Sequence, residues 1–599
     1  MRVASLIALL AGLGLALDAH AMPGAIVMAA ISTAVGYAMG TVVAGGIAMA
    51  FFRSFATSFV LSALGGLFGK SNSQAQSSFQ AEARGRQELV RSSVEPRRVI
   101  VGEAVSSGPL VFAMTEGANN DYLHIVLPVH FTEADSITDV YLNDDVVKVG
   151  DLDANGDVVK GKFAAYLRVR KFLGTTGSPT PANAADTDLI AASSGKWTAA
   201  HRLENIAGVY LRLRYQDALF PAGIPNIRVV VRGAMCYDPR DAGTRWTMNP
   251  ALILRHYLTV SWGLGCDSTE IDDTLVTAAA NVCDERVLMG GTYTATFTVI
   301  ADDDELTFTA DEKNIGTGDG VRFTSSGTLP GGVSAATTYY AIRTAVDKCK
   351  LAATYAGALA GTVMSITSNG TGTLTATLYD QARYTCNGSI NTGDKPPTII
   401  ESLLTAMAGT CVYAQGVYRM FAGAYTTPSV TLTTDDLRGG IKVRPRIPRS
   451  QLFNAVRGTY ADPWLGWNPT DFPAVTNATY ETQDGGDQIM RDVQLPYTTN
   501  NVQAQRIAKI ILEKSRQGIT IEMPCKLTVF KLAVWDTVMV TLSQLGWSAK
   551  VFRVMQWTFN PDGGVDLVLQ EEASACYSWS AGEETTVDPA PDTDLPTAD

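Results

Sequence analysis

The stretch "IRVVVRGAMCYDPRDAGTRWTMNPALILRHYLT", residues 227–259, contains the change of pattern on which the fold depends. Its first part, "IRVVVRGAMCYDP", alternates apolar and polar residues and ends in a turn signal, which predicts a β-strand. Its last part, "NPALILRHYLT", predicts a short helix instead. A β-rich region therefore passes into a helix-containing one near residue 250.

The pattern on both sides of this stretch is β-dominated. Upstream, short alternating runs between turn signals fill residues 98–226. Downstream, three more helices are predicted at about 268–285, 395–409 and 502–517. We therefore expect a mainly β protein with a few helices, an α+β chain, and 599 residues are too many for a single core.

Composition shifts divide the chain into seven segments. These are an apolar helical amino-terminal segment (1–75), a polar connector (76–97), a β-rich region (98–260), a helix-containing region (261–289 plus 380–425), an inserted small β module (290–379), a carboxy-terminal β-rich domain with one helix (426–580) and an acidic, Pro-rich tail (581–599). The module is taken as an insertion because helical sequence continues on both sides of it. The tail is predicted to be a solvated tether.

The amino-terminal segment has only four charged side chains in its first 70 residues. Its start resembles a signal peptide, with an A-x-A site at 19–21. Residues 22–52 are uncharged and would span about 46 Å as a helix, so length permits a membrane span. Small residues recur every four positions, a stripe that lets helix backbones approach closely: Ser32, Gly36, Gly40, Ala44 and Ala48. The alternatives are a membrane span, a packed helical hairpin inside an assembly, and a flexible apolar tail.

No cofactor or metal site is predicted. The eight cysteines lack C-x-x-C pairs and nearby histidines, which favours reduced core thiols. The run "DLDANGD", residues 151–157, has the spacing of a calcium loop, but Lys162 stands where the bidentate acid belongs. A β-hairpin turn at Asn155-Gly156, with both residues at positive φ, is the favoured interpretation.

Catalytic spacings are absent from the sequence, so we do not expect an enzyme. The five histidines are scattered, and ordinary strand or turn positions explain them. Adjacent acids could be imagined as glycosidase carboxylates, but such runs usually form solvated turns or helix starts: Asp144-Asp145, Asp272-Asp273 and Asp302-Asp303-Asp304. The net charge of −12, without a Lys/Arg-rich run, argues against specific nucleic-acid binding.

Five segments resemble the tail tip attachment proteins of lambda-type siphophages, the host-specificity protein J family. In order, they are residues 217–259 with "VRG", "YDPR" and "NPA", "AAANVCDE" (278–285), "RYTCNGSI" leading into "IIESLLTAMAG" (383–409), "FNAVRGTYADPWLGW" (453–467) and "FRVMQWTFNPDGGVDLVLQEEA" (552–573). The inserted module is similar to a small β unit of phage structural proteins, through "GTGDGVRFTSSGTLP" and "TTYYAIR".

The resemblance implies a multidomain tail-hub architecture and a homotrimer that closes the tail tube at the tail tip of the virion. It also implies contacts with the tape measure protein and with distal tail and other tail-tip proteins. The chain departs from the longer members because it lacks their carboxy-terminal fibre portion, so a separate receptor-binding fibre or tip protein is expected. DNA would pass through the ring during ejection, and the amino-terminal segment would contact a host membrane once released.

Two hypotheses from other classes stay open at this point. One is an envelope-polysaccharide- or peptidoglycan-cleaving tip enzyme, which needs a cleft with paired carboxylates. The other is an exported, membrane-anchored bacterial surface protein, which depends on the signal-like start.

Overall fold

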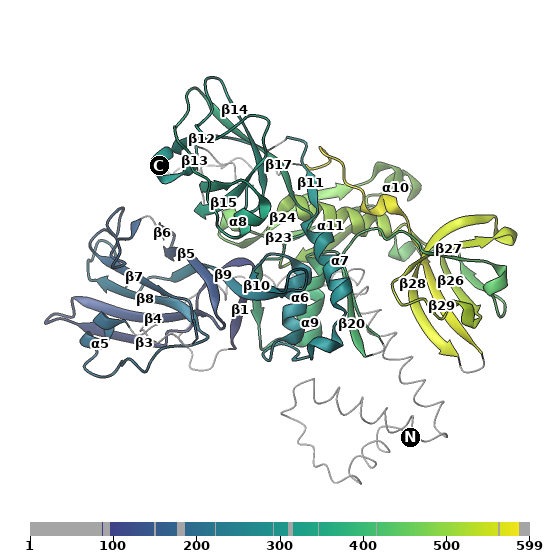
Figure 1. Ribbon diagram of the computed structural model, residues 1–599, viewed down its shortest axis with the longest axis horizontal. Coiled ribbons are helices and arrows are strands. Elements are labelled where there is room, and N and C mark those ends of the chain that lie inside the picture. Colours follow the sequence, from purple (N-terminus) through teal and green to yellow (C-terminus); the bar gives the residue numbers. More distant parts are fainter. Residues whose placement is uncertain are drawn as a thin grey trace, which may run out of the picture.

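The computed structural model describes Gln87 and residues 96–148, 151–176, 186–221, 223–291, 293–309, 315–345, 347–414, 416–560 and 563–585. Within them the chain is mainly β with a few helices, as expected (Figure 1). The predicted stripe from Ser32 to Ala48 lies outside the described residues. In the part that the structure describes, no helix is long and apolar enough to cross a membrane.

Two sheets that share one core form the first β unit, shown in purple and blue in Figure 1. One sheet has the order β3-β4-β8-β7: β3 Phe112–Glu116, β4 Tyr122–His130, β8 Ala207–Arg214 and β7 Leu167–Phe172. The other has the order β10-β9-β5-β6, with β2 also paired to β9: β10 Gly243–Trp246, β9 Ile227–Asp238, β5 Ala134–Leu142, β6 Asp145–Val147 and β2 Glu103–Ser106. The short helix α5 (Thr187–Ala192) packs Leu189 into a smaller cluster beside the first sheet.

The run 151–157 forms the predicted turn. Leu152 bridges to Val158, and Gly156 alone is at positive φ (+79°). The expectation that Asn155 shares this conformation is wrong, because the Asp153 carboxylate accepts the Asn155 and Asp157 N–H groups and holds a tighter Asx-type turn.

Four helices and short β elements form the centre of the molecule around one large core. The helices are α6 Pro250–Thr259, α7 Asp273–Asp284, α9 Pro396–Thr405 and α11 Asn501–Lys514. The β elements are the pair β1 Arg98–Val101 with β18 Gly388–Asn391, the hairpin β19 Thr410–Ala414 with β20 Val417–Phe421, and a three-stranded sheet. This sheet has the order β24 Asn468–Thr476, β23 Ala455–Asp462 and β25 Met490–Leu495. The short helix α10 (Ala478–Gln483) connects β24 to β25.

All three predicted helix ranges are close to the observed ones, with shifted ends. Helix α7 begins at Asp273 instead of Ser268, because Ile271 bridges to Tyr418 and the Asp272 carboxylate caps the helix. Helix α9 ends at Thr405, before Gly409, and Ala408 takes the left-handed conformation. Helix α11 starts at Asn501 after the Asn500 cap, one residue before the predicted start, and ends three residues early at Lys514.

A closed β-barrel rises from this centre (Figure 1). Its strand order is β11-β17-β12-β13-β16-β15-β14, and β17 pairs with β14 to close the sheet: β11 Arg286–Leu288, β12 Thr294–Ile300, β13 Glu305–Phe308, β14 Gly320–Ser325, β15 Tyr339–Ala345, β16 Lys348–Ala352 and β17 Leu374–Ala382. Helix α8 (Tyr355–Leu359) lies beside β15 and β16. The barrel has its own core of Phe, Leu, Ile and Ala side chains, as a self-folding module requires.

A six-stranded sheet forms the carboxy-terminal unit, at the opposite side of the molecule from the first β unit (Figure 1). Its order is β21-β27-β28-β29-β26-β22: β21 Val430–Leu432, β27 Thr537–Leu542, β28 Trp547–Asn560, β29 Gly564–Glu571, β26 Thr520–Cys525 and β22 Lys442–Arg444. Only β21 pairs in parallel, with β27. Its core is separate from that of the centre.

The start of the acidic tail is bound to the protein. The side chain of Gln505 on α11 exchanges two hydrogen bonds with the backbone of Thr585. Glu584 is buried and accepts the Gly290 N–H at 2.6 Å, and Glu583 pairs with Lys509. The expectation of a solvated tail is therefore wrong for residues 581–585, because these side chains find partners on α11 and at the base of the barrel.

All eight cysteines are free thiols, and only Cys266 is less than fully buried. Burial raises the pKa of Cys236 and of Cys349 to about 12, so these thiols stay protonated. The burial agrees with the expectation of core cysteines, and their reduced state stays a prediction.

Candidate functional site

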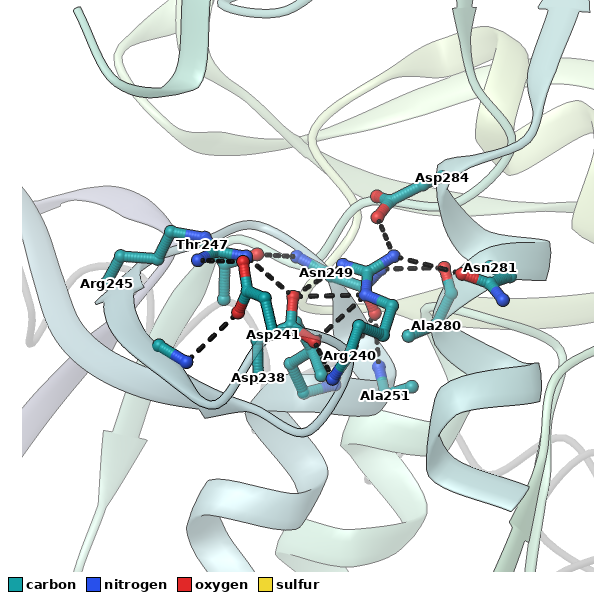
Figure 2. Close-up of polar contacts among 12 residues, drawn as sticks. Asp238, Arg240, Asp241, Arg245, Thr247, Asn249, Ala251, Ala280, Asn281 and Asp284 are labelled. Carbon is teal, nitrogen blue, oxygen red and sulfur yellow. Dashed lines mark hydrogen bonds and ion pairs between the residues drawn. The ribbon is translucent and has the colours of Figure 1, made fainter. Parts of the chain in front are cut away.

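The turn between β9 and β10 carries a connected polar cluster at the edge of the centre (Figure 2). Asp238 ends β9, and Pro239 directs the chain back, so the Asp238 carboxylate accepts the backbone N–H of Arg240 at 3.0 Å. The same carboxylate, only 1% exposed, receives the guanidinium groups of Arg240 at 2.8 Å and Arg245 at 2.9 Å. A buried charge is thus paired twice.

Arg240 extends this cluster to a helix and to the barrel. Its guanidinium contacts Asp284 at 2.8 Å and Asn281 at 3.3 Å, both near the end of α7. The Asp284 carboxylate also accepts the hydroxyl of Tyr355, on α8 beside the barrel, at 3.2 Å. The first β unit, the helical centre and the barrel are therefore joined through one connected set of charges.

The electrostatics of this set favour its ionised form. Burial opposes ionisation of Asp238, but the hydrogen bonds from Arg240 and the charge of Arg245 hold the pKa of this carboxyl below its ordinary value. Hydrogen bonding to Asp238 also raises the pKa of Arg240. The charged groups of the cluster are all engaged in ion pairs with one another, so the cluster acts as a structural contact that joins the units.

Asn249 joins α6 to α7 beside this turn (Figure 2). Its side-chain oxygen accepts the N–H groups of Ala251 at 3.1 Å and Leu252 at 3.4 Å, which caps α6. Its side-chain nitrogen donates to the Ala280 carbonyl at 2.9 Å. One buried side-chain amide therefore pairs with free N–H groups at the start of α6 and with a backbone carbonyl of α7.

Replacing Asn249 by alanine is expected to lower the free energy of unfolding by about 2 kcal/mol, because the cap and a buried hydrogen bond are lost together. Asn477→Ala, at the cap of the short and exposed α10, should cost about 1 kcal/mol or less. Urea denaturation of the two variants measures both values. Equal losses would show that the Ala280 contact is not important.

The base of the barrel contains a second buried set of charges. Arg286 on β11 donates to Asp380 on β17 at 2.7 Å, so the two strands that connect the barrel to the centre are tied together. The Arg286 guanidinium also lies over the rings of Tyr340 (5.3 Å) and Tyr355 (4.9 Å). These contacts join β11, β17, β15 and α8 at the base of the barrel.

A polar cavity lies where the first β unit, the centre and the barrel meet. It leaves about 80 Å³ for the centres of water molecules, enough for several waters. Glu103 on its wall is paired with Arg232 and Arg343, each at 3.2 Å. The Asp319 carboxylate, on the barrel side, accepts the Gly316 N–H at 2.8 Å, and burial raises its pKa to about 7. The cavity is a polar joint between units.

Several of the acids singled out from the sequence have structural partners. Asp272 caps α7 and Asp273 pairs with Arg255 at 2.6 Å. Asp145 pairs with Lys162 at 2.5 Å and Asp144 with Arg228 at 3.3 Å. Asp157 in the proposed calcium loop pairs with Arg168. Among the described residues, no group of three or more His, Cys, Asp or Glu side chains could hold a metal ion.

Two histidines are buried in the described part of the chain, and His256 on α6 is half-buried. His124 lies between the Tyr210 hydroxyl (2.8 Å) and Glu116 (2.9 Å). His130 accepts the Ile100 N–H at 2.9 Å, and burial lowers its pKa to about 3. His256 is also held neutral, because burial lowers its pKa to about 4. These histidines are strand and helix residues of the core, as expected.

Sequence reasoning missed the ionic joint. The "YDPR" turn was noted as part of a resemblance, but its partners Asp284 and Tyr355 are 44 and 115 residues away from Arg240. The Asp-Pro-Arg order is the only local signal, because it predicts a turn that binds its own arginine. Nothing local marks Tyr355.

The fold and the joint define a class: a multidomain structural protein whose β units are fixed to a helical centre. Residues 395–557 match the family model Phage-tail_3, described as "Putative phage tail protein". A relative, the baseplate hub protein pb3 of Escherichia phage T5, is 24% identical over 206 residues, which cover 34% of this chain and 22% of that protein. The alignment thus spans less than a quarter of that relative's length.

A solved chain from the virion of a native gene transfer agent (GTA) particle shares the fold. The similarity covers 93% of this chain and 99% of that chain, with a TM-score of 0.50 and 14% sequence identity. Together these matches support a phage tail protein located in the tail of the virion.

Proposed function

We propose that the chain is the structural hub of a phage tail tip, a homotrimer that caps the tail tube and organises tip and fibre proteins. One observation carries this proposal: segments that resemble the lambda-type tip proteins converge in space. The Cys386 N–H donates to Met248 at 2.7 Å, the Tyr384 N–H donates to Cys283 at 3.1 Å, and Asn249 bonds Ala280. Segments far apart in the sequence thus build one centre.

The partners follow from this role. We propose contacts with the tape measure protein, with distal tail and other tail-tip proteins, and with a separate receptor-binding fibre or tip protein. The hub takes part in host attachment and lets DNA pass through its ring during ejection, without specific nucleic-acid binding. The role needs no cofactor and no enzymatic activity, which agrees with the ion pairs that engage Asp144, Asp145 and Asp273.

Imaging of purified virions tests the proposal. Antibody against the chain should label the end of the tail, and a symmetry-resolved reconstruction should show three copies there. Labelling along the whole tube, or a copy number matching the hundreds of tube subunits, would contradict the hub role.

We further propose that the apolar segment packs through its stripe of small residues inside the tip and contacts a host membrane after release. Replacing both Gly36 and Gly40 by leucine should then lower plaque numbers by about tenfold or more, because close helix packing is blocked. The double variant Ala34→Leu and Ala38→Leu, off the stripe, is the matched control. Equal plaque numbers for the two variants would remove the role of the stripe.

A further inference from the structure

An exposed apolar patch lies on the carboxy-terminal sheet unit. Leu527 is 52% exposed, Phe530 53% and Phe559 38%. The Phe530 ring makes edge-to-face contacts with Trp557 at 5.5 Å and with Phe559 at 6.0 Å. The patch is therefore rigid and clustered, unlike singly scattered surface residues, and such patches mark interaction sites.

Two exposed lysines border this patch. Exposed Lys526 and Lys531 flank Leu527 and Phe530 in the sequence. Lys526 donates to the Asp435 carbonyl, and Lys531 has no ion pair within the described residues. The net charge of the whole chain is −12, whereas these two lysines place positive charge beside the apolar side chains. An acidic partner surface fits this rim.

The barrel carries a surface of matching character. At the turn between β12 and β13, Ile300 is 43% exposed, and Asp302 and Asp303 beside it are exposed. These two carboxylates make no ion pair within the described residues, whereas Asp304 accepts the Ile366 N–H. The turn thus presents one apolar side chain beside two free negative charges.

The two surfaces lie far apart in one molecule. Figure 1 shows the barrel with β12 and β13 at the upper left and the sheet of β26, β28 and β29 at the right, with the helical centre between them. They cannot meet within one chain. Two different complementary patches on one protomer are the arrangement that builds rings by head-to-tail contact.

We propose that the patch of Leu527, Phe530 and Phe559 binds the β12–β13 turn of a second copy of this chain. Ile300 packs against the phenylalanine rings, and Lys526 and Lys531 pair with Asp302 and Asp303. The aromatic side chains supply the buried anchor, and the charged rim sets the register. This inference rests on the proposed hub function, because it names the surfaces through which copies of the hub bind one another.

Charge reversal tests the contact with the full-length chain. Lys526→Glu with Lys531→Glu, and separately Asp302→Lys with Asp303→Lys, should each weaken self-association by about tenfold or more in sedimentation velocity, because like charges then face each other. The quadruple variant, which swaps the charges, should restore association. Lys160→Glu with Lys196→Glu, two exposed lysines of the first β unit, is the matched control. Circular dichroism confirms that every variant is folded.

The apolar anchor has its own test. Phe530→Ser should weaken self-association by about tenfold, whereas Tyr215→Ser, at a side chain 64% exposed on the first β unit, should leave it unchanged.

The following results would overturn the inference: a wild-type chain that stays monomeric, association that survives either double reversal, or a quadruple variant as weak as the doubles. If the Phe530→Ser variant associates normally but is absent from virions, the patch binds another tail protein, and this result would also overturn the inference. Absence of the wild-type chain from virions would instead defeat the proposed function, so the two failures are distinct.

Discussion

Replacing Arg240 by alanine is expected to lower the free energy of unfolding by about 3 kcal/mol. Asp238 is 1% exposed, and without Arg240 its charge keeps only Arg245, whose side chain is half exposed. Asp284 would lose its ion pair at the same time. The loss is large because a buried charge is left with too few partners, which costs more than the pair itself contributes.

Urea denaturation followed by tryptophan fluorescence measures this loss, since Trp246 lies at the end of β10 beside the turn. Arg245→Ala is the matched control, because it removes an arginine from the same carboxylate but at an exposed position. It should cost less than about 1 kcal/mol. Similar losses for Arg240→Ala and Arg245→Ala would show that the link to Asp284 does not stabilise the protein.

The second large effect is on pH dependence, through Asp319 at the base of the barrel. Burial raises the pKa of Asp319 from 3.8 to about 7, opposed by the Gly316 N–H and by the charge of Arg286, and Asp380 raises it further. Because the folded pKa lies above the unfolded one, the contribution of Asp319 to stability is fully present below pH 3.8 and is lost as the pH rises through about 7. Above that pH a buried carboxylate must carry a charge.

Asp319→Asn should remove this loss. The variant keeps an acceptor for the Gly316 N–H but never ionises, so at about pH 8 it should be more stable than the wild type by up to about 4 kcal/mol. At about pH 4 the two proteins should differ little. Calorimetric melting over this pH range checks the difference, and exposed Asp303→Asn is the control.

Other buried groups also titrate, and the comparison with the wild type removes their effects. Burial raises the pKa of Asp139 to about 6, which acts in the same direction as Asp319. Burial lowers the pKa of His130 to about 3 and of His256 to about 4, so these residues destabilise the fold as the pH falls below 6.5. A pH-independent difference between Asp319→Asn and the wild type would contradict the assignment.

The helices were predictable because each has a local signature. The Asn249 and Asn500 caps and the apolar runs after them lie within one or two turns of chain. The exact helix boundaries were less predictable. The start of α7, for example, depends on the pairing of Ile271 with Tyr418, which is 147 residues away. The small β module was expected, but its closure through the pairing of β14 with β17 was not. The alternation of apolar and polar residues predicts which face of a strand is buried, but it does not predict which strand lies next to it.

The exposed surface patch and the contacts of the tail were the least predictable parts. The sequence lacks a Lys/Arg-rich run, yet Lys526 and Lys531 frame the exposed aromatic patch once Phe559 is brought beside Phe530. The acidic tail was expected in water, yet Glu584 is buried against Gly290. In both cases the deciding partner is distant in the sequence.

The sequence by itself determined the elements: alternating strands, capped helices and the turn at Gly156, because periodicity, capping and turn chemistry act over a few residues. Only the tertiary structure decided how these elements are joined. Arg240, Asp284 and Tyr355 form one joint because chain closure over tens of residues brings them together, and burial then makes their charges depend on one another.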